Sequence, residues 1–184
     1  MVTNNNIFKL IKNLPNVKIE FHQLQYGIFT TNFFLKDLVC ILKNHFIYYF
    51  KILTYIAGVD YPNNLKRFLV VYDFLSVKFN NRIRLKILVN ETLPVKSLSF
   101  LFPGALWWEN EAWDMFGIIF SRQKILVRLL TDYGFLGYPL RKDFPLSGFV
   151  ESKYNLFTDK ISYNKLELAQ SYRAFKQDSP WQKN

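Results

Sequence analysis

The order of apolar and polar residues predicts alternating strands and helices in the first two thirds of the chain. Residues 17–31 alternate between the two classes and carry threonine and aromatic side chains, which is typical of one or two strands. Residues 35–45 repeat apolar residues at helical spacing and predict a helix. Residues 50–62 are typical of a strand that ends at Gly58 and Pro62.

A β-hairpin is predicted next, because residues 67–79 and 82–89 flank the pair Asn80-Asn81. Asparagine tolerates the left-handed backbone that a two-residue turn requires. The second arm alternates basic and apolar residues, so one face should be solvated and the other should lie on a core. The alternating residues are Arg82, Ile83, Arg84, Leu85, Lys86 and Ile87.

Two helices should follow the hairpin. Pro94 opens a predicted short helix over residues 95–102, and residues 105–116 suit a second helix that stops at Gly117. Trp108, Trp113 and Phe116 are expected to pack this second helix onto the sheet. Its apolar stripe would contain Ala105, Trp108, Ala112 and Met115, with Glu109 and Asn110 away from it.

The later part of the chain offers fewer regular elements. Residues 117–120 and 125–130 are short apolar runs that could form strands. From residue 131 glycine and proline recur, and Pro139 and Pro145 exclude a long helix or a central strand. Five aromatic residues in this segment must then lie against another surface, on this domain or on a partner: Tyr133, Phe135, Tyr138, Phe144 and Phe149.

The expected fold is therefore α+β, with a mostly antiparallel sheet and helices on one face. Residues 1–130 should form this core domain, and residues 131–184 should form an extended C-terminal arm that wraps partner subunits. At most one short helix, over residues 165–175, is expected within the arm.

Composition narrows the chemistry. The formal charge is +10, and residues 1–100 contribute 13 Lys and Arg against 5 Asp and Glu, which gives +8. Such a basic half suits an anionic neighbour or simply a solvated lysine-rich surface. The single cysteine cannot form an internal disulfide, and it falls short of the roughly four ligands of an iron–sulfur cluster. The two histidines, 22 and 45, match no zinc spacing, and no nucleotide, haem or flavin motif occurs, so no cofactor is expected.

The charged clusters favour ion pairs over catalysis. Glu109 and Glu111 point about 200° apart on a helix, so they cannot act together as acid and base on one substrate atom. With Asp114 they are expected to pair with arginines. The run of residues 141–143, Arg-Lys-Asp, lacks a glycine-rich phosphate cradle, so an Arg–carboxylate fork is the favoured interpretation.

No segment predicts a signal peptide or a membrane span. Lysines interrupt the apolar residues of the N-terminus, and charged residues break the apolar region over residues 33–59 below the ~18–20 residues of a span. The chain is expected to be soluble or peripheral to a membrane.

Three blocks together resemble a known family. Residues 65–92 (LKRFLVVYDFLSVKFNNRIRLKILVNET), 107–122 (WWENEAWDMFGIIFSR) and 129–151 (LLTDYGFLGYPLRKDFPLSGFVE) are similar to the 30 kDa subunit of respiratory complex I, which is called NADH dehydrogenase subunit 9 when mitochondrially encoded. The N-terminal fifty residues match it poorly. Asn110 replaces the family's usual arginine, and Leu136 and Tyr138 replace its acidic residue and histidine.

The resemblance implies a cofactor-free core subunit of the peripheral arm of the proton-translocating NADH:ubiquinone oxidoreductase, with no catalytic residues of its own. Its partners would be the large quinone-site subunit and the iron–sulfur subunits beside it, on the matrix side of the mitochondrial inner membrane or the cytoplasmic face of a bacterial plasma membrane. The alternatives are a nucleic-acid-binding α+β module and a small acid–base enzyme using Glu109 or Glu111. The interface or arm-anchoring residues that the motif implies are Glu109, Glu111, Asp114, Tyr133, Phe135, Arg141, Lys142, Asp143 and Phe144.

Overall fold

The chain forms two compact units in the computed structural model, Met1–Phe144 (unit 1) and Pro145–Asn184 (unit 2). The apolar core lies entirely in unit 1: every buried apolar side chain of the described residues falls between Ile28 and Phe120. The structure describes residues 17–22, 25–46, 48–123, 125–175 and 181.

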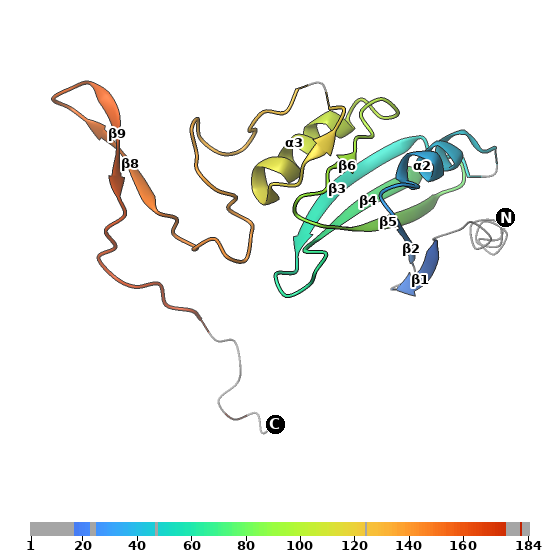
Figure 1. Cartoon of the computed structure of the whole chain (residues 1–184), viewed down its shortest axis with the longest axis horizontal. Coiled ribbons are helices and arrows are strands. Elements are labelled where there is room, and N and C mark those ends of the chain that lie inside the picture. The colour runs from blue at the N-terminus through green and yellow to red at the C-terminus, as the bar shows by residue number, and fades with distance from the viewer. Residues whose placement is uncertain (1–16, 23–24, 47, 124, 176–180, 182–184) are drawn as a thin grey trace. The chain divides into compact units, whose positions relative to one another are not determined.

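A five-stranded sheet forms the centre of unit 1 (Figure 1), with strand order β1-β2-β5-β4-β3. Neighbouring strands run antiparallel except β2 and β5, which run parallel. The mostly antiparallel α+β fold predicted from the sequence is confirmed. The strands are β1 Lys18–His22, β2 Gln25–Thr30, β3 Ile52–Asp60, β4 Phe68–Ser76 and β5 Asn81–Val89.

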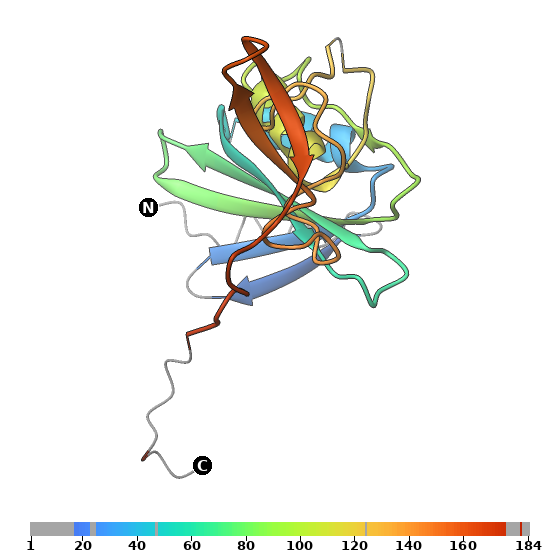
Figure 2. The same ribbon diagram turned by 90° about the vertical axis from the view of Figure 1, so that its left-hand side faces the viewer.

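Helices α2 (Leu35–Asn44) and α3 (Ala105–Phe116) lie on the same face of this sheet (Figures 1 and 2). Alternate residues of β4 and β5 point to that face and are buried, as the period of two along a strand requires. The predicted apolar positions of α2 are all buried against them: Leu35, Leu38, Val39 and Leu42.

Helix α3 packs closely on β3. The Trp108 ring meets the Tyr55 ring edge to face at 4.9 Å, and Phe116 lies so near Gly58 that a Cβ there would come within 2.6 Å of it. Gly58 therefore lies inside β3 to admit the ring, and its predicted role as a strand stop was wrong. Trp113 lies beneath the guanidinium of Arg128.

The predicted polar face of α3 was wrong at two positions. Glu109 and Asn110, expected off the apolar stripe, are buried at 0% and 4% exposure. The cause is that unit 1 places hydrogen-bond partners at both side chains: Ser97 and the Leu98 N–H donate to Glu109, and the Gln123 side chain donates to Asn110. A buried polar group is tolerated when it is bonded in this way.

The β4–β5 hairpin is confirmed, but its turn differs from the prediction. Asn81 pairs with Ser76, so the connection contains four residues, 77–80, instead of the pair Asn80-Asn81. Asn80 alone takes a left-handed backbone, at φ +49°. One asparagine in that conformation closes the longer loop.

The helix predicted over residues 95–102 was wrong. Val95–Lys96 form β6, which pairs in parallel with β7, Phe120–Ser121, and a turn follows. The side chains of Ser97 and Glu109 accept the backbone N–H groups of Ser99 and Leu98 and so compete with helical bonding. The run at 117–120 contributes only to β7, and the described residues of 125–130 form no strand.

Unit 2 contains a hairpin where at most one short helix was expected. Strand β8 (Val150–Asn155) pairs antiparallel with β9 (Lys160–Lys165), and Asp159 in the connecting turn has φ +49°. Residue 165, the start of the predicted helix, closes β9, and none of the described residues up to 175 is helical. In the described part of the chain, no helix is long and apolar enough to span a membrane.

Gly117 ends α3 at φ +77°, and a Cβ there would lie 2.5 Å from Arg141 Nη2 and 2.8 Å from the Tyr138 ring. We expect Gly117→Ala to lower the free energy of unfolding by about 1–2 kcal/mol through backbone strain and by about 1–3 kcal/mol more through this clash. Gly134 is the matched control, because its φ is +73° with nothing within 4 Å of a Cβ. Urea unfolding of the full chain should show only the strain term for Gly134→Ala. Equal losses for both variants would contradict the close packing of Arg141 and Tyr138 against the end of α3.

Candidate functional site

Residues 128–144, here named the anchored segment, have no helix or strand and yet follow a defined path over unit 1. Buried carboxylates of the core hold their backbone. Several large apolar side chains of the same segment point into solvent: Leu130 (62% exposed), Tyr133 (98%), Leu136 (85%) and Leu140 (53%). Apolar side chains on a fixed backbone are the typical composition of a protein-binding surface.

Asp114, on the third turn of α3, anchors the beginning of the segment. Its Oδ2 accepts the backbone N–H groups of Leu129, Leu130 and Thr131 at 3.1, 2.8 and 3.0 Å. Its Oδ1 accepts the Thr131 hydroxyl at 2.6 Å and Arg128 Nη1 at 2.9 Å. Burial alone would raise the pKa of Asp114, but the hydrogen bonds from Thr131, Leu130 and Arg128 together hold this pKa below its ordinary value.

Arg128 extends the same anchor to three aromatic rings. Its guanidinium lies 5.5 Å from the centre of the Trp113 ring, 5.8 Å from Phe135 and 5.4 Å from Tyr138. Its Nη1 also donates to the Gly137 carbonyl at 3.2 Å. One arginine therefore joins α3 to the middle of the anchored segment through charge, hydrogen bonds and cation–π contacts.

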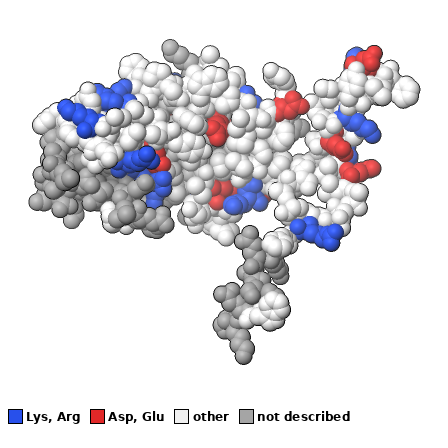
Figure 3. Space-filling view, turned by 180° about the vertical axis from the view of Figure 1, so that it is seen from behind, with Lys and Arg blue, Asp and Glu red and all other residues white. Residues whose placement is uncertain are grey.

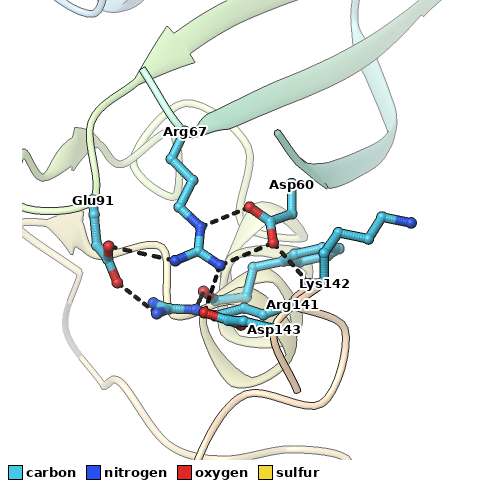
Figure 4. A network of polar contacts seen from close by, with 7 residues as sticks. Asp60, Arg67, Glu91, Arg141, Lys142 and Asp143 are labelled. Atoms are coloured by element: carbon cyan, nitrogen blue, oxygen red, sulfur yellow. Dashed lines mark hydrogen bonds and ion pairs between the residues drawn. The ribbon is translucent and has the colours of Figure 1, made fainter. Parts of the chain in front are cut away.

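A second buried carboxylate, Asp60 at the end of β3, anchors the other end of the segment (Figure 4). Arg67 forms a two-pronged pair with it, Nε to Oδ1 at 2.8 Å and Nη2 to Oδ2 at 3.0 Å. The Lys142 backbone N–H donates to the same Oδ2 at 2.8 Å. The hydrogen bond from Arg67 is the main reason that the pKa of Asp60 is lowered. Burial opposes this shift, and the bond from Lys142 and the charge of Arg141 add to it.

Glu91 bridges the two arginines of this network. Its Oε2 lies 3.6 Å from Arg67 Nη1, and its Oε1 accepts Arg141 Nη1. Arg141 Nε donates to the Phe116 carbonyl at 2.6 Å, which ties the segment to the last residue of α3. Arg67 Nη2 also reaches Asp143 Oδ2 at 2.9 Å.

Glu109 lies apart from this site. Its Oε2 accepts the Ser97 hydroxyl and its Oε1 accepts the Leu98 N–H, both at 2.7 Å, and its side chain is wholly buried. Burial raises the pKa of Glu109, and these two bonds partly oppose the shift. A carboxyl that no substrate can reach is unsuited to the acid–base role considered above.

The remaining motif residues occupy varied places. Glu111 is half-buried near Tyr55, whose pKa is raised first by burial and then by the Glu111 charge. Tyr133 is almost fully exposed, whereas Phe135 and Phe144 are half-buried with ring centres 5.9 Å apart. Lys142 takes part through its backbone, and its side chain is exposed.

Sequence reasoning missed five of the anchors: Asp60, Arg67, Glu91, Arg128 and Thr131. A signal was present, because Asp60 closes an apolar strand and Arg128 interrupts the run ILVRLL. A single charge within apolar residues often marks a buried ion pair. Among the described residues, no group of three or more His, Cys, Asp or Glu side chains could hold a metal ion.

Comparison with known proteins gives the family. A sequence model described as the 30 kDa subunit of respiratory-chain NADH dehydrogenase matches residues 31–150, which hold both anchoring networks. The chain belongs to this family. The first fifty residues were expected to match the family poorly, but the match begins at residue 31.

Similar proteins from other organisms support the same family assignment. The chain is 47% identical to NADH dehydrogenase [ubiquinone] iron-sulfur protein 3 of Beta trigyna, over 83% of this chain and 80% of that protein. It is 40% identical to NADH-ubiquinone oxidoreductase subunit 9 of Prototheca wickerhamii, over 97% and 95% of the two chains. The chain is therefore plainly similar to complex I subunits of this family.

A solved structure shares the fold of this chain. A chain of the membrane-bound sulfane sulfur reductase, an archaeal respiratory membrane complex, superposes with a TM-score of 0.66 at 21% identity. The superposition covers 77% of this chain and 85% of the other. At that identity the likeness shows the fold alone.

We expect the stability of the full chain to fall in acid because of Asp60 and Asp114. Both folded-state pKa values lie below the unfolded value of about 3.9, so the ionised carboxylates stabilise the fold above that pH. This stabilisation is lost as pH falls through the folded-state values. Asp114→Asn should lower the free energy of unfolding by about 2–4 kcal/mol at pH 7 and make its loss in acid shallower. Urea unfolding between pH 2 and 7 would contradict this if both proteins showed the same slope below about pH 4.

Arg141 and Lys142 offer a neighbouring pair of variants. We expect Arg141→Lys to destabilise the full chain by about 1–3 kcal/mol. The guanidinium donates from Nε to the Phe116 carbonyl and from Nη1 to Glu91, and the one nitrogen of lysine does not reproduce both positions. Lys142→Ala keeps the backbone bond to Asp60 and should change stability by less than about 0.5 kcal/mol. Thermal unfolding would distinguish the two, and a larger loss for Lys142→Ala would show that the network is wrong.

Proposed function

We propose that the chain is a cofactor-free core structural subunit in the peripheral arm of proton-translocating NADH:ubiquinone oxidoreductase. There it supports the iron–sulfur and quinone-site subunits while electrons pass from NADH to ubiquinone. Its own composition supports the absence of a cluster: the sequence has one cysteine, whereas clusters take about four ligands. Several relatives are named "iron-sulfur protein". We propose that for this chain the clusters belong to neighbouring subunits.

The observation that carries the structural role is that unit 2 has no core of its own. None of its described residues is buried, and large apolar side chains along it are more than half exposed. A two-stranded hairpin alone in water is marginally stable. Unit 2 therefore requires a surface to cover it. The exposed residues are Leu146, Phe149, Val150, Tyr154, Leu156, Phe157, Ile161, Tyr163, Leu168, Tyr172, Phe175 and Trp181.

The register of the hairpin sorts its side chains into two faces. Pairing of Tyr154 with Ile161, of Ser152 with Tyr163 and of Val150 with Lys165 places these six residues on one face, of which four are apolar or aromatic. The opposite face is polar: it carries Glu151, Lys153, Asn155, Lys160, Ser162 and Asn164. An amphipathic hairpin of this kind is suited to lie with its apolar face on a partner subunit.

The partner that we propose for unit 2 and for the exposed side chains of the anchored segment is the large quinone-site subunit. Together the two regions would form an obligate contact of about 2,000 Å² or more. The buried carboxylates Asp114 and Asp60 hold the two ends of the anchored segment and so keep its exposed side chains in a fixed arrangement. Such an arrangement lowers the entropic cost of association. We place the assembly on the matrix side of the mitochondrial inner membrane, since the relatives named above come from eukaryotes.

We expect the apolar face of the hairpin to be required for assembly. Tyr154→Thr with Ile161→Thr should deplete the chain from the high-mass complex, because the double variant removes apolar contact area while keeping strand propensity. Lys153→Thr with Ser162→Thr, the adjacent pair on the polar face, is the matched control and should assemble normally. Blue-native electrophoresis of gently solubilised membranes, with in-gel NADH oxidation, measures both. Normal assembly of the apolar-face variant would contradict the proposed function. So would a wild-type chain that migrates as a free species of about its own mass.

A further inference from the structure

A second surface of unit 1, at the start of α2, combines exposed phenylalanine rings with lysines. It is formed by Phe33, Lys36, Lys96 and Phe100, and is named the Lys–Phe surface. Phe33 is 70% exposed and Phe100 is 87% exposed. It involves none of the residues of the anchored segment or of unit 2.

Hydrogen bonds connect the two loops that carry the rings. The Asn32 side chain donates to the Pro94 carbonyl at 2.7 Å and accepts the Lys96 backbone N–H at 3.1 Å. The Lys96 ammonium donates to the Phe33 carbonyl at 2.9 Å. The two loops are thus held in one arrangement, although they lie far apart in sequence.

The turn that contains Phe100 is fixed as well. The backbone N–H of Leu98 donates to buried Glu109, and the N–H groups of Leu101 and Phe102 return to the Leu98 carbonyl at 2.9 Å. Lys43, on α2, donates to the Leu101 carbonyl from the other side. A ring that is largely exposed on an ordered turn is placed for contact with another molecule.

The charge around the rings is positive. The Lys96 ammonium lies 4.7 Å from the centre of the Phe33 ring, and the Lys36 ammonium lies 5.7 Å from that of Phe100. Asp37, in the first turn of α2, is the neighbouring carboxylate. Beyond these two lysines, Figure 3 shows several Lys and Arg side chains on one face of the molecule, in keeping with the charge of +8 over residues 1–100.

We propose that the Lys–Phe surface binds an acidic segment of a neighbouring protein subunit. Carboxylates of that segment would pair with Lys36 and Lys96, and its apolar side chains would cover the exposed parts of Phe33 and Phe100. This contact is separate from the one proposed for unit 2. The basic N-terminal half of the chain would then face an acidic protein partner.

The geometry favours a protein over a nucleic acid or a membrane. Bases stack on open aromatic faces, but lysine ammoniums already lie over one face of both rings. Insertion of the rings into a bilayer would draw these same ammoniums toward the apolar layer, which is costly for a charged group. A carboxylate side chain can reach the ammonium while its methylene groups cover the ring edge.

Lysine reactivity in the intact complex tests this proposal. Lys78 is the matched control: it too lies over aromatic rings, 5.2 Å from Tyr49 and 5.4 Å from Phe79, but in the β4–β5 turn at the opposite end of the sheet. We expect a water-soluble acetylating reagent to modify Lys36 and Lys96 about tenfold more slowly in the complex than in the isolated full chain, as for a site that is about nine-tenths occupied. Lys78 should react at similar rates in both.

A zero-length carbodiimide applied to the same complex should join Lys36 or Lys96 to Asp or Glu residues of another subunit. Equal acetylation rates for these lysines in complex and free chain would overturn the proposal, and so would equal slowing of Lys78. Protection that disappears on lipid removal or nuclease treatment, with no carboxylate coupling, would overturn it in favour of a lipid or a nucleic acid. A chain that is missing from the complex contradicts the proposed function instead, so the two failures are distinguishable.

Discussion

Capture of backbone N–H groups by buried carboxylates is the interaction on which the anchored segment depends. A segment without helix or strand has donors that no regular partner satisfies, and leaving buried donors unpaired is costly. One oxygen of Asp114 accepts the N–H groups of residues 129–131, and one oxygen of Asp60 accepts that of Lys142. The arginines that neutralise these carboxylates, Arg128 and Arg67, also hold the segment, so charge balance and positioning come from the same side chains.

The regular elements followed from the sequence because their signals are local. The spacing of Leu35, Leu38, Val39 and Leu42 defines the buried face of α2, and the alternation from Arg82 to Ile87 defines the two faces of β5. Gly117 marked the end of α3 because a left-handed residue there favours glycine. These signals need no knowledge of distant residues.

The errors arose where a distant partner decides the conformation. Residues 95–102 were predicted to be helical, but the side chains of Glu109 and Ser97 accept the N–H groups of Leu98 and Ser99, which a helix would use. Glu109 was expected off the apolar stripe and paired with an arginine, because a helical pattern gives no sign of its actual partner Ser97. The site residues in the anchored segment were found through family motifs, whereas Asp60 and Glu91 lie about fifty to eighty residues from the arginine and lysine that they bind.

Two features together explain a chain of this composition. Unit 1 folds around its own core and displays apolar side chains on a fixed, irregular segment. Unit 2 has an apolar hairpin face, and none of its described residues is buried. Both features suit a protein whose fold is completed by neighbours. Membership of the 30 kDa subunit family of respiratory-chain NADH dehydrogenase provides such neighbours.

Hydrogen exchange at the amides of Leu130 and Thr131 tests the central claim most directly. Both belong to an irregular surface segment, where amides ordinarily exchange fast. If Asp114 holds them, their exchange in the full chain should be as slow as that of the Gly117 amide, which donates to the Trp113 carbonyl at the end of α3. Exchange at the rate of the exposed Tyr172 amide would show that buried carboxylates do not fix this segment, and would contradict the account.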